Sequence, residues 1–151
     1  TVDEKPFFRD AFENRRCLIL ADGFYEWNGE RGSKEPYRIE RTDQEPFAFA
    51  GLWETWGSNG DEIQTCAILT TESNDTVAPV HDRMPVMLEP DEESQWLSAE
   101  DPERVAAVCD PYPDSELHAY RISKAVNDPD NDGPEILDPA DNSQSGLDEF
   151  A

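Results

Sequence analysis

The chain has 151 residues, of which 35 are acidic and 12 basic, and its formal net charge is −23. This length allows one domain with a hydrophobic core and is short for two. The acids are spread along the whole chain, which indicates a solvated, salt-adapted surface such as a halophile's, because concentrated salt screens the self-repulsion. An acidic nucleic-acid mimic, or a binder of basic partners, is the less favoured alternative because it needs the acids on one face.

Cellular location and metal binding can be judged from a few sequence features. The sequence has no signal peptide and no apolar run of about 18 residues, which predicts a soluble cytoplasmic protein without membrane contact. Cys17, Cys66 and Cys109 have apolar neighbours, so we expect buried, reduced thiols. No CxxC or Cys/His pairing occurs, and we expect no metal and no other cofactor. The chain begins with Thr1 rather than Met, so we expect a processed chain or a piece of a longer protein.

The first half of the chain predicts one helix followed by several strands. Apolar residues at helical spacing predict a short amphipathic helix over 4–15. Apolar or alternating runs then predict strands at 17–21, 24–27, 36–40, 47–53 and 63–71. The run at 47–53 is almost entirely apolar, so we expect it to be buried on both faces or inside a barrel. The run at 36–40 alternates and predicts a half-exposed strand.

The second half predicts helices around a few further strands. We expect a strand at 86–88, helices at 91–97 and 101–109, and a last strand at 118–122. Segment 134–139 is a candidate for packing back onto the domain, and residues 140–151 are expected to form an acidic, disordered tail. Strands joined by turns, without regular intervening helices, predict an α+β fold with a curled, mostly antiparallel, barrel-like core and peripheral helices.

The stretch RCLILADGFYEW, residues 16–27, contains the first candidate for chemistry. It joins a buried apolar run to an Asp-Gly turn and then places Glu26 between Tyr25 and Trp27. A carboxyl group in aromatic surroundings is a candidate for proton transfer. On the pattern alone, the favoured alternative is an outward-facing strand carboxylate in a very acidic protein.

The stretch VHDRMPVMLEP contains the second set of candidates. His81, taken alone, has the usual alternative of a structural hydrogen-bonding role. Arg83 is less easily explained as structural, because Arg104 is the only other basic residue between Arg41 and Arg121. A cation kept beside a histidine in so anionic a chain is a candidate anchor for a phosphate or carboxylate.

Several blocks of this sequence together resemble the SOS response-associated peptidase (SRAP) family, which includes vertebrate 5-hydroxymethylcytosine-binding proteins. The blocks, in order, are RCLILADGFYEW, KEPYRIE, FAFAGLWETW, TCAILTTESN, HDRMPVML, YRISKAVN and DGPE. The resemblance extends over 1–139 and implies the curled, mostly antiparallel fold. It also implies binding to single-stranded DNA and covalent crosslinking to abasic sites. In that reaction a mature N-terminal cysteine, exposed by autoproteolysis, forms a thiazolidine with the sugar aldehyde.

The resemblance also assigns roles to four residues. Glu26 corresponds to the family's active-site glutamate in ADGFYEW, and His81 to the histidine of HDRMP. Arg83 of the same motif is implied as a phosphate contact, with Thr70 of ILTTES as a weaker one. Glutamate suits the proton transfers of Schiff-base formation, and histidine suits assistance to sugar-ring opening or imine stabilisation.

Three other side chains of functional residue types are expected to be structural. His118 has no comparable neighbours and is interpreted as a surface residue. Trp53 and Trp56 are interpreted as core or rim residues, with stacking on DNA bases as the alternative.

The chain departs from the SRAP pattern at its start. The resemblance implies a cysteine at the mature N-terminus and a later DNA-binding block like NARAET, and Thr1 looks like the last residue of that block. We therefore expect a domain, 1–139, that lacks its N-terminal portion and does not crosslink DNA as it stands. The expected parent is a monomer that binds abasic single-stranded DNA and joins the nucleoid during repair. Two alternatives remain: a peptidase of the N-terminal-nucleophile kind using Thr1, and a non-catalytic acidic module that binds proteins.

Overall fold

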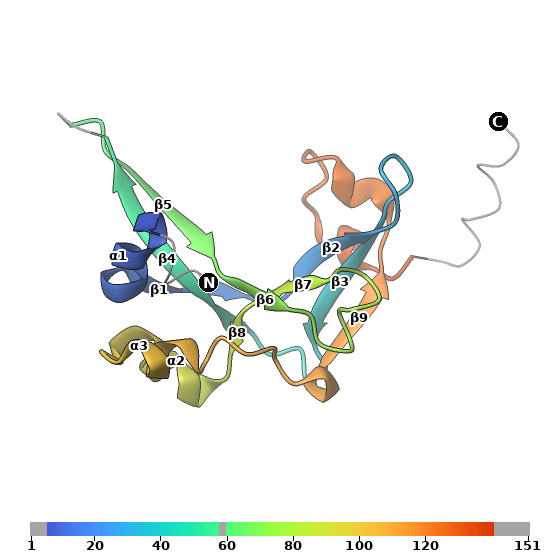
Figure 1. Ribbon diagram of the computed structural model, residues 1–151. Coiled ribbons are helices and arrows are strands. Elements are labelled where there is room, and N and C mark those ends of the chain that lie inside the picture. The colour runs from blue at the N-terminus through green and yellow to red at the C-terminus, as the bar shows by residue number, and fades with distance from the viewer. Residues whose placement is uncertain (1–5, 58–59, 141–151) are drawn as a thin grey trace, which may run out of the picture.

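The computed structural model describes residues 6–57 and 60–140, with side chains from residue 8, and shows helices beside antiparallel sheets (Figure 1). The helices are α1 (Pro6–Asn14), α2 (Pro90–Ser98) and α3 (Pro102–Ala106), with short 3-10 turns η1 (Asp114–Glu116), η2 (Lys124–Asn127) and η3 (Pro134–Leu137). The strands are β1 (Arg16–Ala21), β2 (Phe24–Asn28), β3 (Glu35–Arg41), β4 (Phe47–Trp56), β5 (Ile63–Ile68), β6 (Thr70–Glu72), β7 (Arg83–Pro85), β8 (Met87–Leu88) and β9 (Leu117–Arg121). The predicted α+β class is confirmed, and in the described residues the sheets stay open rather than closing into a barrel. Of the predicted tail, 140–151, all residues but Ala140 lie outside the described residues.

The first sheet has the order β1-β4-β5, with β8 also paired to β4, and all of its pairs are antiparallel. Helices α1 and α2 pack on it around Trp96, which is fully buried. The Trp96 ring meets Phe12 edge to face at 6.0 Å, and its Nε1–H donates to the Cys17 carbonyl at 2.9 Å. This hydrogen bond satisfies the one polar group that burial of the indole would otherwise leave without a partner.

The second sheet, β2-β3-β9, and the two-stranded sheet β6-β7 share another core. Its buried members come from these two sheets, from β4 and β8 of the first sheet, and from loops: Ile39, Phe47, Phe49, Val77, Met84, Met87, Tyr112 and Leu117. Phe47 and Phe49 belong to β4, so this strand contributes to both cores of the domain. Its buried run, Phe47 to Leu52, therefore agrees with the predicted burial on two faces.

The predicted single strand at 63–71 is two strands in different sheets. β5 pairs with β4, whereas β6 pairs with β7. Between them, the Leu69 N–H donates to the Ala50 carbonyl at 3.0 Å and the Leu69 carbonyl accepts from Val86 at 2.8 Å. Leu69 is thus hydrogen-bonded to Ala50 of β4 and to Val86, which lies between β7 and β8, and the chain changes sheets at this point. In place of the predicted strand at 86–88 the structure has two short strands. β7 ends at Pro85, before the predicted start, and β8 consists of Met87 and Leu88.

The segment after β9 folds back on the second sheet, as predicted for 134–139. The Ala140 N–H donates to the Arg121 carbonyl at 2.8 Å, and the Tyr120 hydroxyl donates to the Leu137 carbonyl at 3.0 Å. On the same sheet, Arg38 and Glu40 are only 6% and 8% exposed. The predicted half-exposed strand at 36–40 is therefore wrong for its polar face, which the folded protein covers.

The prediction of buried cysteines is wrong for Cys66, which is exposed on β5, while Cys17 and Cys109 are half-buried. Cys66 lies on β5, which is at the edge of the described sheet and has all six of its residues exposed. Burial, with a smaller effect of the neighbouring Cys66 thiol, raises the pKa of Cys17. Among the described helices, none has both the length and the apolar character to cross a membrane.

Candidate functional site

The short sheet β6-β7 brings two predicted site residues into direct contact. The Arg83 guanidinium donates through Nη2 to the Thr70 carbonyl oxygen at 2.6 Å and to the Thr70 hydroxyl at 3.1 Å. The antiparallel register pairs Thr70 with Pro85, so Arg83 reaches Thr70 diagonally across the ladder. Because both residues are exposed, the cation is held in place at the surface.

His81 joins this cluster through the backbone of Arg83. Its Nδ1 lies 3.0 Å from the Arg83 backbone nitrogen, 3.1 Å from the Arg83 carbonyl oxygen and 3.3 Å from the Asp82 carboxylate. In the neutral ring Nδ1 accepts from the Arg83 N–H, and in the protonated ring it donates to one of the two oxygens. In both forms the contacts fix the ring through Nδ1 and leave Nε2 available. The side chain is 42% exposed, so this nitrogen is within reach of a ligand.

The loop before His81 is held by Asn74, which was not among the predicted site residues. Its side-chain amide donates to the Tyr112 carbonyl at 2.7 Å, and its side-chain oxygen accepts from the Val77 N–H at 3.0 Å. The His81 N–H in turn donates to the Val77 carbonyl at 3.0 Å, and Val77 is fully buried. The signal in the sequence is an asparagine in a polar ESND segment, which is typical of a side-chain-capped turn.

Glu26 lies on β2, and its surroundings differ from those predicted. Successive strand residues point to opposite faces, so Tyr25 and Trp27 share one face, with ring centroids 6.4 Å apart, and Glu26 lies on the other. The two aromatic rings that flank Glu26 in the sequence therefore lie on the face opposite its side chain. Its cross-strand partner is Tyr37, and its side chain is half-buried rather than fully outward.

Glu26 and His81 border the same hydrophobic core. Tyr37, opposite Glu26, packs against the second core cluster, which also contains Val77 and Met84 on either side of His81. Among the described residues, no hydrogen bond or ion pair joins Glu26 to the His81 cluster. The structure therefore brings Thr70, His81 and Arg83 together and places Glu26 on a neighbouring sheet of the same core.

A buried charge network lies on the sheet face opposite Glu26. Arg38 Nε donates to the Glu40 carboxylate at 2.8 Å, and Nη2 donates to the Asp22 carbonyl oxygen at 3.2 Å. Burial opposes the charge of Arg38, yet its hydrogen bonds and charge attraction to the Glu40 and Asp22 carboxylates outweigh burial and raise its pKa. An added Cβ at Gly23 in the β1–β2 turn would lie 2.7 Å from the guanidinium carbon, so a larger residue there would push the Arg38 guanidinium out of its present position. This turn immediately precedes the strand that carries Glu26.

His118 belongs to the same network, although its side chain is 42% exposed, as the interpretation of a surface residue expects. Its Nε2 lies 3.4 Å from the Glu40 carboxylate, and its ring stacks on Tyr120 with centroids 5.4 Å apart. The register places it opposite Glu40 on adjacent strands, a pairing that sequence order alone does not reveal. Trp53 and Trp56 are 39% and 49% exposed, which agrees with a rim position rather than the core.

Within the residues that the structure describes, no group of three or more His, Cys, Asp or Glu side chains lies close enough together to hold a metal ion. The groups that this site offers to a bound molecule are the His81 imidazole and the Arg83 guanidinium. Together they favour an anionic ligand.

Comparison with known proteins places this chain in a family. Residues 1–129 match the family model described as SOS response associated peptidase (SRAP). The chain belongs to the SRAP family. It is 40% identical over 142 residues to the "Abasic site processing protein YoqW" of Bacillus subtilis, which covers 91% of this chain and 63% of YoqW. It is 30% identical over 158 residues to the "Abasic site processing protein HMCES" of Xenopus tropicalis, covering 91% of this chain and 47% of that protein.

Solved SRAP-like structures agree with the fold. A crystal structure of a protein from Bacteroides thetaiotaomicron has a TM-score of 0.84 and 31% sequence identity, covering 93% of this chain and 63% of that one. A protein from Bordetella bronchiseptica has a TM-score of 0.72 and 29% identity, covering 82% and 62% respectively. The chain thus spans less than two thirds of the length of these relatives and solved structures, and the resemblance seen in its sequence motifs is confirmed at the level of family.

Proposed function

We propose that this chain is part of a protein that recognises abasic sites in single-stranded DNA, and that Thr70, His81, Arg83 and Glu26 form its DNA-facing site. Relatives named abasic site processing proteins support the DNA-repair class. The observation that carries the assignment of the site is the exposed Arg83 guanidinium, anchored on Thr70 beside His81 in a chain of net charge −23. A cation held at the surface beside an imidazole is suited to an anionic ligand.

Arg83 is suited to bind a phosphate of the DNA backbone. Both contacts with Thr70 use Nη2, so the remaining N–H donors of the guanidinium can reach phosphate oxygens. The Thr70 hydroxyl accepts from Arg83 and retains its own hydrogen for a second donor–acceptor contact. Phosphate contacts of this kind fix the position of the strand without reading its sequence.

The covalent step proposed for the full-length protein forms a thiazolidine with the open-chain sugar. An N-terminal amine adds to the aldehyde carbon and water leaves, which gives an imine, and the thiol of the same residue then adds to the imine carbon. Glu26 would take the proton from the amine and deliver it to the departing hydroxyl. His81, held through Nδ1, would use Nε2 to assist opening of the sugar ring.

The three cysteines of this chain cannot perform that step. Cys17, Cys66 and Cys109 are internal, so their nitrogens are amides and cannot condense with an aldehyde. The reaction requires an amine and a thiol on one residue. We therefore assign the present chain the phosphate-binding and proton-transfer groups, and assign the nucleophile to an N-terminal cysteine of the full-length protein.

The binding part of the proposal is tested with the chain itself and single-stranded DNA that carries a tetrahydrofuran abasic analogue. Arg83→Met is compared with Arg104→Met, which removes the same charge from the only other basic position between Arg41 and Arg121. We expect Arg83→Met to weaken binding and to lower the slope of log affinity against log salt by about 0.7, as for one phosphate contact. Equal effects of the two substitutions would contradict the assignment.

The chemical part is tested by crosslinking of the full-length protein to abasic single-stranded DNA. Glu26→Gln and His81→Ala are expected to slow crosslinking, whereas Glu30→Gln, in the exposed loop after β2, keeps the rate. General acid–base groups contribute rate factors of about 100 to 10,000, so the loss should be easily measured. An unchanged rate for Glu26→Gln would refute its role, and turnover of peptides without crosslinking would favour a peptidase.

A further inference from the structure

The loop 73–82, between β6 and β7, carries His81 and is closed at its ends. Its first residue, Ser73, donates through its N–H to the carbonyl of its last residue, Asp82, at 3.2 Å. Inside the loop the His81 N–H donates to the Val77 carbonyl at 3.0 Å, four residues earlier, as in a helical turn. The backbone position of His81 therefore depends on how the middle of the loop is held.

Asn74 holds the middle of this loop through both its backbone and its side chain. Its side-chain oxygen accepts from the Val77 N–H at 3.0 Å. Its backbone N–H donates to the Met84 Sδ at 3.4 Å, and its side-chain amide donates to the Tyr112 carbonyl at 2.7 Å. Met84 and Tyr112 are 1% and 3% exposed and lie in the second core. Asn74 thus joins the turn before His81 to two buried residues outside the loop.

Tyr112 is a fixed anchor for that amide. Its hydroxyl accepts from the Arg41 guanidinium at 3.2 Å and donates to the Glu116 carboxylate at 3.2 Å. A second hydrogen bond reaches the same segment, from the Thr76 hydroxyl to the Asp114 carbonyl at 2.9 Å. The loop is therefore tied at two points to a segment that the second core holds in place.

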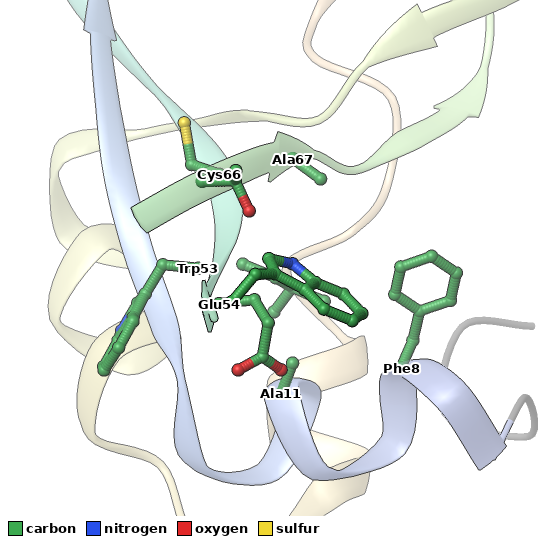
Figure 2. Close-up of a pocket in the computed structure, with 9 residues that line it drawn as sticks. Phe8, Ala11, Trp53, Glu54, Cys66 and Ala67 are labelled. Atoms are coloured by element: carbon green, nitrogen blue, oxygen red, sulfur yellow. The ribbon is translucent and has the colours of Figure 1, made fainter. Parts of the chain in front are cut away.

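His81 itself lies at the surface, outside the pocket shown in Figure 2. That pocket has a volume of about 100 Å³, and its lining residues all come from α1, β4 and β5. The His81 side chain is 42% exposed, so solvent surrounds part of the ring. A partly exposed side chain moves between rotamers unless contacts fix it. The contacts between Nδ1 and the Arg83 backbone fix this ring, and they require the loop to hold the His81 backbone beside β7.

We propose that Asn74 is a positioning residue for His81. Its amide, bonded to the Tyr112 carbonyl, holds the loop in the arrangement in which Nδ1 of His81 meets the Arg83 backbone and Nε2 stays available. A carboxamide supplies both the donor for Tyr112 and the acceptor for Val77, whereas a carboxylate supplies the acceptor alone. This role rests on the proposed function of His81 in crosslinking, and it adds the residue through which the second core sets the place of the imidazole.

Asn74→Asp tests this role with little change of shape. The carboxylate keeps an acceptor for the Val77 N–H and loses the donor to the Tyr112 carbonyl. Asn131→Asp is the matched control, because the Asn131 side-chain amide donates to the Ala125 carbonyl at 3.0 Å in an exposed segment outside the loop. Both variants remove one amide–carbonyl hydrogen bond and add one negative charge. Only the first should disturb the imidazole.

The first measurement uses this chain alone, without DNA. NMR of the unmodified chain should show one set of His81 ring signals, with Nδ1 as a hydrogen-bond acceptor when the imidazole is neutral, and slow exchange of the Arg83 amide. In Asn74→Asp we expect ring signals averaged over several rotamers and exchange of the Arg83 amide about tenfold faster. Asn131→Asp should match the unmodified chain. Unchanged ring signals and exchange in Asn74→Asp would overturn the proposal.

The second measurement is the rate at which the full-length protein crosslinks to a saturating amount of abasic single-stranded DNA. Asn74→Asp should slow this step about tenfold to a hundredfold, because misplacement of a reacting group by about 1 Å can cost about a hundredfold in rate. Noncovalent binding of the tetrahydrofuran analogue, which depends on Arg83, should stay the same. Asn131→Asp should keep both the rate and the binding.

A double variant separates positioning from a general loss of stability. Once His81 is replaced by Ala, Asn74→Asp should slow crosslinking no further. Equal slowing with and without His81 would show that Asn74 acts on stability alone, and it would overturn the proposal. If His81→Ala by itself leaves the rate unchanged, the proposed function fails at His81, whereas the ring signals still decide whether Asn74 positions it.

Discussion

Replacement of Arg38 by Met is expected to be one of the most destabilising single changes on the second sheet. The side chains of Arg38 and Glu40 are 7% and 10% exposed and are joined by a 2.8 Å hydrogen bond. Loss of the guanidinium leaves the Glu40 carboxylate buried without its main partner, which typically costs about 3–5 kcal/mol. His118 remains 3.4 Å from Glu40, so we expect the lower end, about 3 kcal/mol.

Urea unfolding at constant salt measures this effect. With a slope of about 2 kcal/mol per M urea, a loss of 3 kcal/mol lowers the midpoint by about 1.5 M. The matched control is Lys124→Met, which removes the same charge from a 2.8 Å pair with Glu35 whose side chains are 55% and 36% exposed. Exposed pairs contribute about 0–1 kcal/mol, so the control midpoint should move little.

The double variant Arg38→Met with Glu40→Met separates an unpaired charge from lost packing. Apolar replacement of both members of a buried ion pair is often neutral or stabilising. We therefore expect the double variant to recover most of the stability that Arg38→Met loses. The reasoning is refuted if Arg38→Met costs no more than Lys124→Met, or if the double variant is no more stable than Arg38→Met alone.

Three further predictions concern stability. Trp96→Ala should cost about 3–5 kcal/mol in urea unfolding, because it empties a fully buried site in the first core. Gly23→Ala should cost about 1–3 kcal/mol by the same assay, because its Cβ would overlap the Arg38 guanidinium, 2.7 Å away. Burial raises the pKa of Tyr112 to about 12. The contribution of the neutral Tyr112 to the free energy of unfolding is therefore complete below the unfolded pKa of about 10, and it is lost as the pH rises towards 12. Thermal unfolding across this range should show that loss, and Tyr112→Phe should lack it.

Local patterns predicted many of the elements because their causes are local. The apolar run that begins at Phe47 is a buried strand, and Asp101 with Pro102 begins a helix, where the Asp101 side chain accepts from the Glu103 N–H at 3.0 Å. A capping carboxylate and a proline at the first helical position act within a few residues. These elements can therefore be predicted without knowledge of the rest of the fold.

Long-range pairing explains the predictions that were wrong. Arg38 and Glu40 alternate with apolar residues as an exposed polar face would, but the folded protein covers that face. Cys66 has apolar neighbours as a core residue would, but it lies on an edge strand. Sequence alternation identifies the two faces of a strand and does not show what packs on each face.

The sequence by itself determined the family, the α+β class and the four candidate residues of the site, because these depend on residue identity and on motifs whose order is preserved. Only the tertiary structure decided that Arg83 is anchored on Thr70, that Glu26 lies opposite Tyr37, and that His118 lies opposite Glu40. These facts depend on strand register and on which sheets share a core. Register is set by contacts between residues far apart in the chain, so no local pattern could supply it.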